Sequence, residues 1–147
     1  MKPRFISDIH LSENNSHLTN AFKRFLNESK ESCSHLFILG DLFEAWIGDD
    51  NNNAYHQEIK ELLIEFTKNG PETFFIHGNR DFLIGQDFAK EVGISLLPDP
   101  YTIDINGLKV ILSHGDFLCT DDLDYINFRS LVRSKNWQKD FLSKDLN

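Results

Sequence analysis

The sequence predicts an α/β fold in which helices cover a largely parallel sheet. Two observations carry this prediction. Short apolar runs, typical of buried strands, alternate along the chain with longer segments whose apolar residues have helical spacing. The pair Asn106-Gly107, a strong hairpin-turn signal, lies between two further strand-like runs. We therefore expect a layered α/β architecture with an antiparallel hairpin added on one side of the sheet.

The first half of the chain is expected to form three strand–helix units. Apolar runs predict strands at residues 5–6, 35–39 and 73–77. Helical spacing of apolar residues predicts helices at 16–30 and 54–68, and around 86–91. Ser16 is the expected N-cap of the first helix, and Asn69-Gly70-Pro71 is expected to end the second.

The second half is expected to form the hairpin and then two helices. The hairpin strands are predicted at residues 101–105 and 108–113. Apolar residues at helical spacing then predict helices at 121–133 and 135–144.

Composition narrows the class of protein. The chain has 147 residues, of which 40% are hydrophobic and 26% charged, as in an ordinary soluble globular domain. Lys and Arg number 15 against 23 Asp and Glu, and the net charge of −8 argues against nucleic-acid binding. Two cysteines, Cys33 and Cys119, are too few for a disulfide framework, so we expect reduced thiols in a cytosolic protein.

The sequence also bears on the membrane. No apolar run reaches the ~18–20 residues that a membrane-spanning helix needs. The apolar stretch near the N-terminus stops at Ser7-Asp8, which is too short for a signal peptide. We expect a protein that neither spans a membrane nor is exported, while binding to a membrane surface stays open.

Residues that can bind metals follow four of the predicted strands. Asp8 and His10 follow the first strand, Asp41 the second, Asn79 the third, and His114 the second hairpin strand. Ligands of open α/β sheets bind beyond the carboxyl ends of the strands. We therefore expect these five side chains to meet at one edge of the sheet.

The residue types favour a particular kind of metal site. Carboxylate and amide oxygens with imidazole nitrogens and no thiolate suit Mn²⁺, Fe or Zn²⁺ better than Ca²⁺. A carboxylate such as Asp41 can bridge two cations, and two cations ~3.5–4 Å apart can activate water for a phosphoryl displacement. Each residue alone has an ordinary alternative, since Asp8 or Asn79 could form a turn and His114 could be a core histidine. The ordered set favours the metal site.

The same set resembles the signature of the calcineurin-like metallophosphoesterases. The matching segments are Asp8-X-His10, Gly40-Asp41-X-X-Glu44, Gly78-Asn79-X-Asp81 and His114, within residues 5 to about 116. The resemblance implies a layered α/β sandwich with two metal ions. Asp8 and His10 would hold the first ion, Asp41 would bridge, and Asn79 and His114 would hold the second. Glu44, Asp81 and Asp116 would orient the ligands or their loops.

Longer segments are similar to the UDP-2,3-diacylglucosamine pyrophosphohydrolase branch of that family. They lie at residues 40–50, 78–85, 113–116, 120–129 and 137–142. The resemblance implies a peripheral enzyme on the cytoplasmic side of the inner membrane, without a nucleic-acid or protein partner. Such an enzyme uses Mn²⁺, two ions per site, to cleave the pyrophosphate of a lipid-linked nucleotide sugar. The products are UMP and 2,3-diacylglucosamine 1-phosphate, in lipid A biosynthesis.

The branch also implies substrate-binding residues. Asn79 and Arg80 would meet the substrate phosphate, Asp122 the sugar-nucleotide side, and Tyr125 the same region. Arg80 stands where the generic motif often has a histidine. A guanidinium cannot act as a proton donor at neutral pH, but it can neutralise phosphate charge. That exchange suits pyrophosphate cleavage, because a phosphate leaving group needs less protonation than an alkoxide.

The family pattern continues with a Gly-X-His-X-His segment that completes the metal site, and this sequence ends at Asn147 before it. We expect an N-terminal portion, with a metallophosphoesterase core at residues 1–120 and the beginning of a helical lid at 121–147. Two alternatives stay open: a general metal-dependent phosphodiesterase or phosphatase, and an inactive metal-binding fragment.

Overall fold

The computed structural model describes residues 2–51 and 53–144. The chain divides into two compact units, Met1–His114 and Gly115–Asn147, and each is considered by itself. Within the described residues, no helix is long and apolar enough to cross a membrane.

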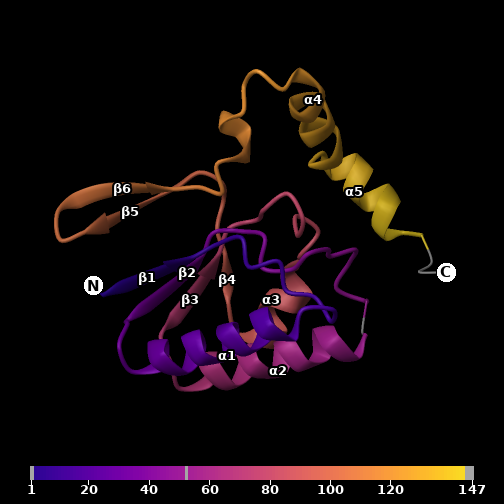
Figure 1. The fold of residues 1–147 in the computed structure, drawn as a ribbon. Coiled ribbons are helices and arrows are strands. Elements are labelled where there is room, and N and C mark those ends of the chain that lie inside the picture. The colour runs from indigo at the N-terminus through magenta and orange to yellow at the C-terminus, as the bar shows by residue number, and fades with distance from the viewer. Residues whose placement is uncertain (1, 52, 145–147) are drawn as a thin grey trace. The chain divides into compact units, whose positions relative to one another are not determined.

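The first unit is built on a four-stranded parallel sheet with the order β1-β2-β3-β4. The strands are β1 (Pro3–Ile6), β2 (His35–Ile38), β3 (Glu72–Phe75) and β4 (Ser95–Leu96). One helix lies between each pair of successive strands: α1 (Ser16–Lys30), α2 (Ala54–Lys68) and α3 (Gln86–Val92). The sheet therefore grows by three successive βαβ crossovers, as the alternating sequence pattern predicts. Figure 1 shows α1 and α2 running together along one face of the sheet.

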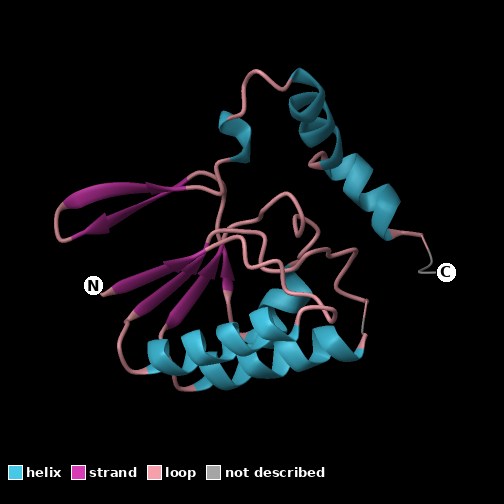
Figure 2. Cartoon of the chain, viewed as in Figure 1, coloured by secondary structure: helices cyan, strands magenta, loops and turns pink. Residues whose placement is uncertain are grey.

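The hairpin of β5 (Tyr101–Ile105) and β6 (Leu108–Leu112) forms a separate two-stranded sheet. Figure 2 shows these two strands set apart from the four parallel ones. The expectation that the hairpin extends the parallel sheet is therefore wrong. Phe37 and Phe74 stack with ring centroids 5.0 Å apart, and the inward side chains of the hairpin pack against this layer. The hairpin is thus held by burial of one apolar face and not by backbone pairing with the parallel sheet.

Most expected elements of this unit are confirmed to within two residues. The expected N-cap Ser16 is wrong, because Asn15 caps α1 and accepts a hydrogen bond from the backbone N of Leu18 at 3.3 Å. Asn53 caps α2 in the same way, accepting from the backbone N of His56 at 2.7 Å. The short strand β4 was not expected, because two residues are too few to show a period.

The second unit contains a 3₁₀ turn (Asp116–Leu118), α4 (Leu123–Val132) and α5 (Lys135–Leu142). Its polar centre is the carboxylate of Asp116, whose side chain is 6% exposed. Tyr125 Oη and Arg129 Nε donate to Asp116 Oδ2 at 2.6 and 2.7 Å, and Arg133 lies 3.4 Å away. Burial acts to raise the pKa of Asp116, but these donors outweigh it and hold the pKa below its usual value.

Several apolar side chains of the second unit are exposed. Leu123, Phe128 and Leu131 on α4 are each more than half exposed, and Leu142 on α5 is 43% exposed. Trp137 and Phe141 stack on one another at 4.9 Å.

We predict that Asp116→Ala will loosen α4. The substitution leaves two guanidinium groups without their shared carboxylate, which costs ~3 kcal/mol in comparable buried pairs. Hydrogen exchange of the α4 amides should therefore accelerate. Asp140→Ala is the control, because that carboxylate is 72% exposed and pairs with Lys144 on the surface. Equal exchange rates in the two variants would refute the role given to Asp116.

Candidate metal centre

Backbone hydrogen bonds join the loops after β1 and β2. Asp8 N donates to Gly40 O at 3.1 Å, and His10 N donates to Asp41 O at 3.0 Å. Asp8, His10 and Asp41 all have left-handed backbones, with φ of 55°, 52° and 53°. Such conformations cost about 1–3 kcal/mol each in non-glycine residues and cluster at functional sites. The strain therefore points to a need for these three side chains.

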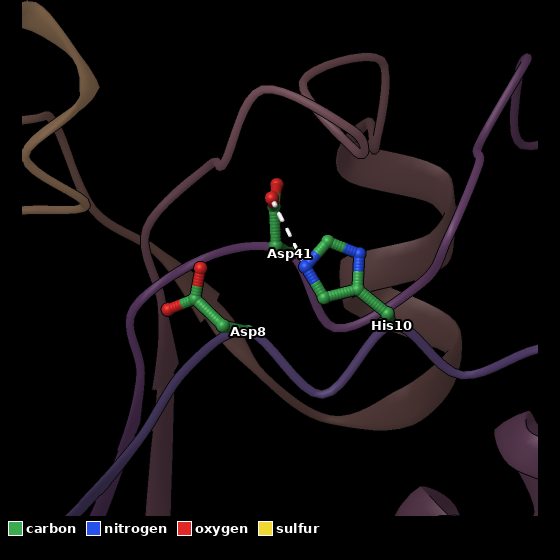
Figure 3. Close-up of side chains that lie close together, drawn as sticks. All are labelled: Asp8, His10 and Asp41. Carbon is green, nitrogen blue, oxygen red and sulfur yellow. Dashed lines mark ion pairs between the residues drawn. The ribbon is translucent and has the colours of Figure 1, made fainter.

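The first half-site consists of Asp8, His10 and Asp41, whose potential ligand atoms all lie within 4.8 Å of one another. Figure 3 shows the three side chains gathered beside the loops, with His10 Nε2 facing Asp41 Oδ2 at 3.7 Å. On the other side of the ring, His10 Nδ1 lies 2.9 Å from Glu44 Oε2. A carboxylate only accepts, so Nδ1 carries the proton and Nε2 turns a lone pair toward Asp41.

The second half-site consists of Asp41, Asn79 and His114. His114 Nδ1 lies 2.9 Å from the backbone O of Leu39, and both ring nitrogens of His114 face oxygen atoms that can only accept a hydrogen bond. Nε2 lies 3.0 Å from Asn79 Oδ1 and 3.8 Å from Asp41 Oδ2. Nε2, the amide oxygen and the carboxylate oxygen therefore converge, and a cation could take the place of a proton between them.

Asp41 stands between the two half-sites. It is 3% exposed, and its two oxygens have different surroundings. Oδ1 accepts a hydrogen bond from the backbone N of Arg80 at 2.8 Å. Oδ2 faces His10 and His114 at nearly equal distances, 3.7 and 3.8 Å. The geometry suits a carboxylate that is shared by two cations.

Asp81 lies beneath the centre and is fully buried. Its oxygens accept from the backbone N atoms of Leu42, Gly78 and Asp41 at 2.7, 2.9 and 3.2 Å. Burial raises the pKa of Asp81 to about 6, and the charge of nearby Asp41 acts in the same direction, whereas the backbone hydrogen bonds oppose it.

The loops after β2 and β3 approach so closely that only glycine fits. A Cβ on Gly40 would lie 2.5 Å from the backbone N of Gly78, and a Cβ on Gly78 would collide with Asp41. Gly40 also has φ of +90°, a conformation that L side chains rarely adopt. Together these contacts bring Asn79 next to Asp41.

The five predicted metal ligands therefore lie together. They do not share one sheet edge, since His114 follows β6 of the separate hairpin sheet and reaches the centre by tertiary packing. Arg80 is nearby, with Nη1 3.7 Å from Glu44 Oε1 and its side chain 52% exposed. The carbonyl of Leu39 was missed, because a backbone acceptor leaves no signal in the sequence.

Two further predicted residues belong to the second unit. Asp122 is the N-cap of α4 and accepts from the backbone N of Tyr125 at 2.9 Å. Tyr125 Oη donates to Asp116, and burial with that hydrogen bond raises the pKa of its phenol. Both residues therefore have structural partners within their own unit.

The calcineurin-like phosphoesterase family profile matches residues 1–146. The chain belongs to this family. A UDP-2,3-diacylglucosamine hydrolase of Stenotrophomonas maltophilia (strain R551-3) is 46% identical over 146 residues, covering 99% of this chain and 59% of the relative. A protein of the same name from Photorhabdus laumondii is 49% identical over 138 residues, covering 94% and 58%. The chain thus spans a little under 60% of the length of these relatives.

Two solved structures share the fold. The nuclease MPE of Pseudomonas putida has a TM-score of 0.52 at 23% identity, covering 69% of this chain and 50% of that protein. A protein of unknown function from Aquifex aeolicus, AQ665, has a TM-score of 0.52 at 18% identity, covering 89% and 71%. At these identities the likeness concerns the fold alone, and it agrees with the predicted α/β class.

We predict that Glu44→Ala will weaken binding of divalent metal about 10–100-fold, as losing the partner of a ligating histidine does elsewhere. Without Oε2, nothing selects the His10 tautomer that turns Nε2 toward Asp41. Calorimetric titration of the metal-free chain with Mn²⁺ measures the effect. Glu65→Ala, at an exposed position of α2, should change nothing. Unchanged affinity in Glu44→Ala would contradict the role of Glu44.

We predict that Asp81 makes the stability of the metal-free chain depend on pH. Its folded pKa of about 6 exceeds the usual 3.8, so protonation favours the folded state. The free energy of unfolding should fall as pH rises from about 4 to about 6, by up to roughly 3 kcal/mol from this group. Urea titrations of the native chain and of Asp81→Asn measure it. The difference between the two should change with pH over that range, and a constant difference would contradict the prediction.

Proposed function

We propose that the protein hydrolyses the pyrophosphate bond of UDP-2,3-diacylglucosamine, giving UMP and 2,3-diacylglucosamine 1-phosphate in lipid A biosynthesis. The observation that carries the proposal is the convergence of His10 Nε2 and His114 Nε2 on one oxygen of Asp41. This centre lies in a chain 45–49% identical to proteins named UDP-2,3-diacylglucosamine hydrolase.

The residues fit two divalent cations, which we propose are Mn²⁺. Asp8, His10 and Asp41 would hold the first, and Asp41, Asn79 and His114 the second. When bound, the pair would supply an acidified water and positive charge for the oxygens around phosphorus. Nitrogen and hard oxygen donors without thiolate are compatible with Mn²⁺.

The chain's own groups would orient the substrate. Asn79 and Arg80 would bind the phosphate. The exposed guanidinium of Arg80 lies 3.7 Å from Glu44 and can leave this carboxylate to bind a phosphate oxygen instead. Arg80 would neutralise charge on the leaving phosphate without transferring a proton. His10 and His114 would keep their protons on Nδ1, held there by Glu44 and by the Leu39 carbonyl.

The remaining residues are proposed to serve the lipid part of the substrate. A core at residues 1–120 would carry the metal centre, and residues 121–147 would begin a lid. Asp122 and Tyr125 would bind the sugar-nucleotide side. We also propose that the substrate is amphiphilic and that the protein lies peripherally on the cytoplasmic side of the inner membrane. The exposed apolar side chains of Leu123, Phe128 and Leu131 support both proposals.

The test is release of UMP from UDP-2,3-diacylglucosamine by the purified chain with Mn²⁺. We expect release, and we expect Asp41→Ala to abolish it because both half-sites lose a ligand. A de-acylated UDP-sugar is the second substrate. Equal rates on both substrates would indicate a general phosphodiesterase instead. Mn²⁺ binding without turnover would indicate a metal-binding fragment.

A further inference from the structure

A pocket of about 260 Å³ opens beside the first half-site. Glu44 forms part of its wall, and the same side chain contacts the candidate ligand His10 at 2.9 Å. One residue therefore separates the pocket from the metal centre. No residue already assigned to metal or substrate binding lines it.

The walls of the pocket are largely apolar. Leu11, Ile47, Tyr55 and His56 contribute to them. The hydroxyl of Tyr55 is paired with Thr19 Oγ1 at 2.7 Å, so its partner lies outside the pocket. Burial lowers the pKa of His56, so this ring is neutral at pH 7. The walls therefore offer apolar and aromatic surface against which an uncharged ring of a ligand can pack.

The charged side chains of the lining are acidic, and they lie among the neutral polar residues Ser12, Asn14, Asn51 and Asn53. Ser12, Glu13 and Asn14 line the pocket, and their side chains make no hydrogen bond or ion pair with another residue in 2–51 or 53–144. Glu13 and Glu44 both contribute carboxylates, and no lysine or arginine is found among the described lining residues. The pocket thus repels phosphate and accepts hydrogen bonds from hydroxyl or N–H groups.

These properties select one part of the proposed substrate. The pyrophosphate is anionic and belongs at the cations and Arg80. The acyl chains carry no donor for the two carboxylates, and the volume falls below the ~300–1,000 Å³ of pockets that bury drug-sized ligands. A nucleoside combines a planar neutral ring with hydroxyl donors, and a carboxylate binding ribose hydroxyls is a recurrent arrangement.

We propose that this pocket binds the uridine half of the substrate, with the base against the apolar wall and the ribose hydroxyls on Glu13 and Ser12. The inference rests on the proposed function, whose metal centre holds the adjoining phosphate. It places the UMP product on the Glu44 side of the centre. The pocket then distinguishes a nucleotide from a bare phosphate.

Calorimetric titration of the Mn²⁺-loaded chain with UMP and with inorganic phosphate tests the proposal. Ala45 is exposed and lines the pocket, so Ala45→Trp fills it without entering the core. We expect Ala45→Trp to weaken UMP about 10-fold or more and to leave phosphate unchanged. Ala45→Ser, which adds one atom, is the matched control and should bind UMP normally.

A second variant tests the same pocket without added bulk. Glu13→Gln should weaken UMP several-fold, because an amide accepts a ribose hydroxyl less strongly than a carboxylate does. Glu61→Gln, exposed on α2 and outside the pocket, is its charge-matched control.

The outcomes separate this inference from the proposed function. UMP binding no tighter than phosphate in the native chain, or unaffected by Ala45→Trp, overturns the pocket assignment. The pocket assignment is also overturned if Ala45→Trp weakens binding of N-acetylglucosamine 1-phosphate but leaves UMP binding intact. In that case the sugar half of the substrate, and not the uridine half, would lie in the pocket. Hydrolysis of UDP-2,3-diacylglucosamine is measured separately. If the native chain does not hydrolyse it, but binds UMP in a way that Ala45→Trp weakens, the proposed activity is refuted and the pocket assignment is supported.

Discussion

Asp81 accepts hydrogen bonds from the backbone of both loops that build the centre, through Gly78 on one side and Asp41 and Leu42 on the other. Without that carboxylate these backbone N–H groups would lose a shared acceptor, and a buried N–H that is left unsatisfied costs ~1–3 kcal/mol. The lack of a Cβ at Gly40 and Gly78 lets the same two loops lie against one another. These buried hydrogen bonds to Asp81 hold Asp41 and Asn79 in position relative to one another. The second half-site depends on that position.

The two histidines show a second constraint, which is electrostatic. Each ring uses Nδ1 to donate to a fixed acceptor, Glu44 for His10 and the Leu39 carbonyl for His114. The acceptors differ in charge, but both rings are held with Nε2 facing Asp41 Oδ2. A charged acceptor on His10 makes that ring a stronger donor to a cation than a neutral carbonyl would. The two half-sites are therefore unequal before any metal binds.

The sequence could predict the parts of this site that follow from local pattern. Short apolar runs followed by Asp, His or Asn were enough to predict that these candidate ligands lie close together, because parallel strands deliver their carboxyl ends to one region. The place of His114 depends on long-range packing of the hairpin against Phe37 and Phe74, which no local pattern encodes. Asn15 and Ser16 are both good N-caps by residue type, so only the structure could choose between them.

The left-handed backbones at Asp8, His10 and Asp41 explain why glycine does not occupy these positions. Glycine would remove the strain of φ near +55°, yet each residue must carry a side chain to the centre. The strain is offset by the bonds that join the two loops, from Asp8 N to Gly40 O and from His10 N to Asp41 O. Those bonds fix the backbone whether or not a cation is bound. The ligands are thus held close together by the fold itself, and metal binding does not have to order them.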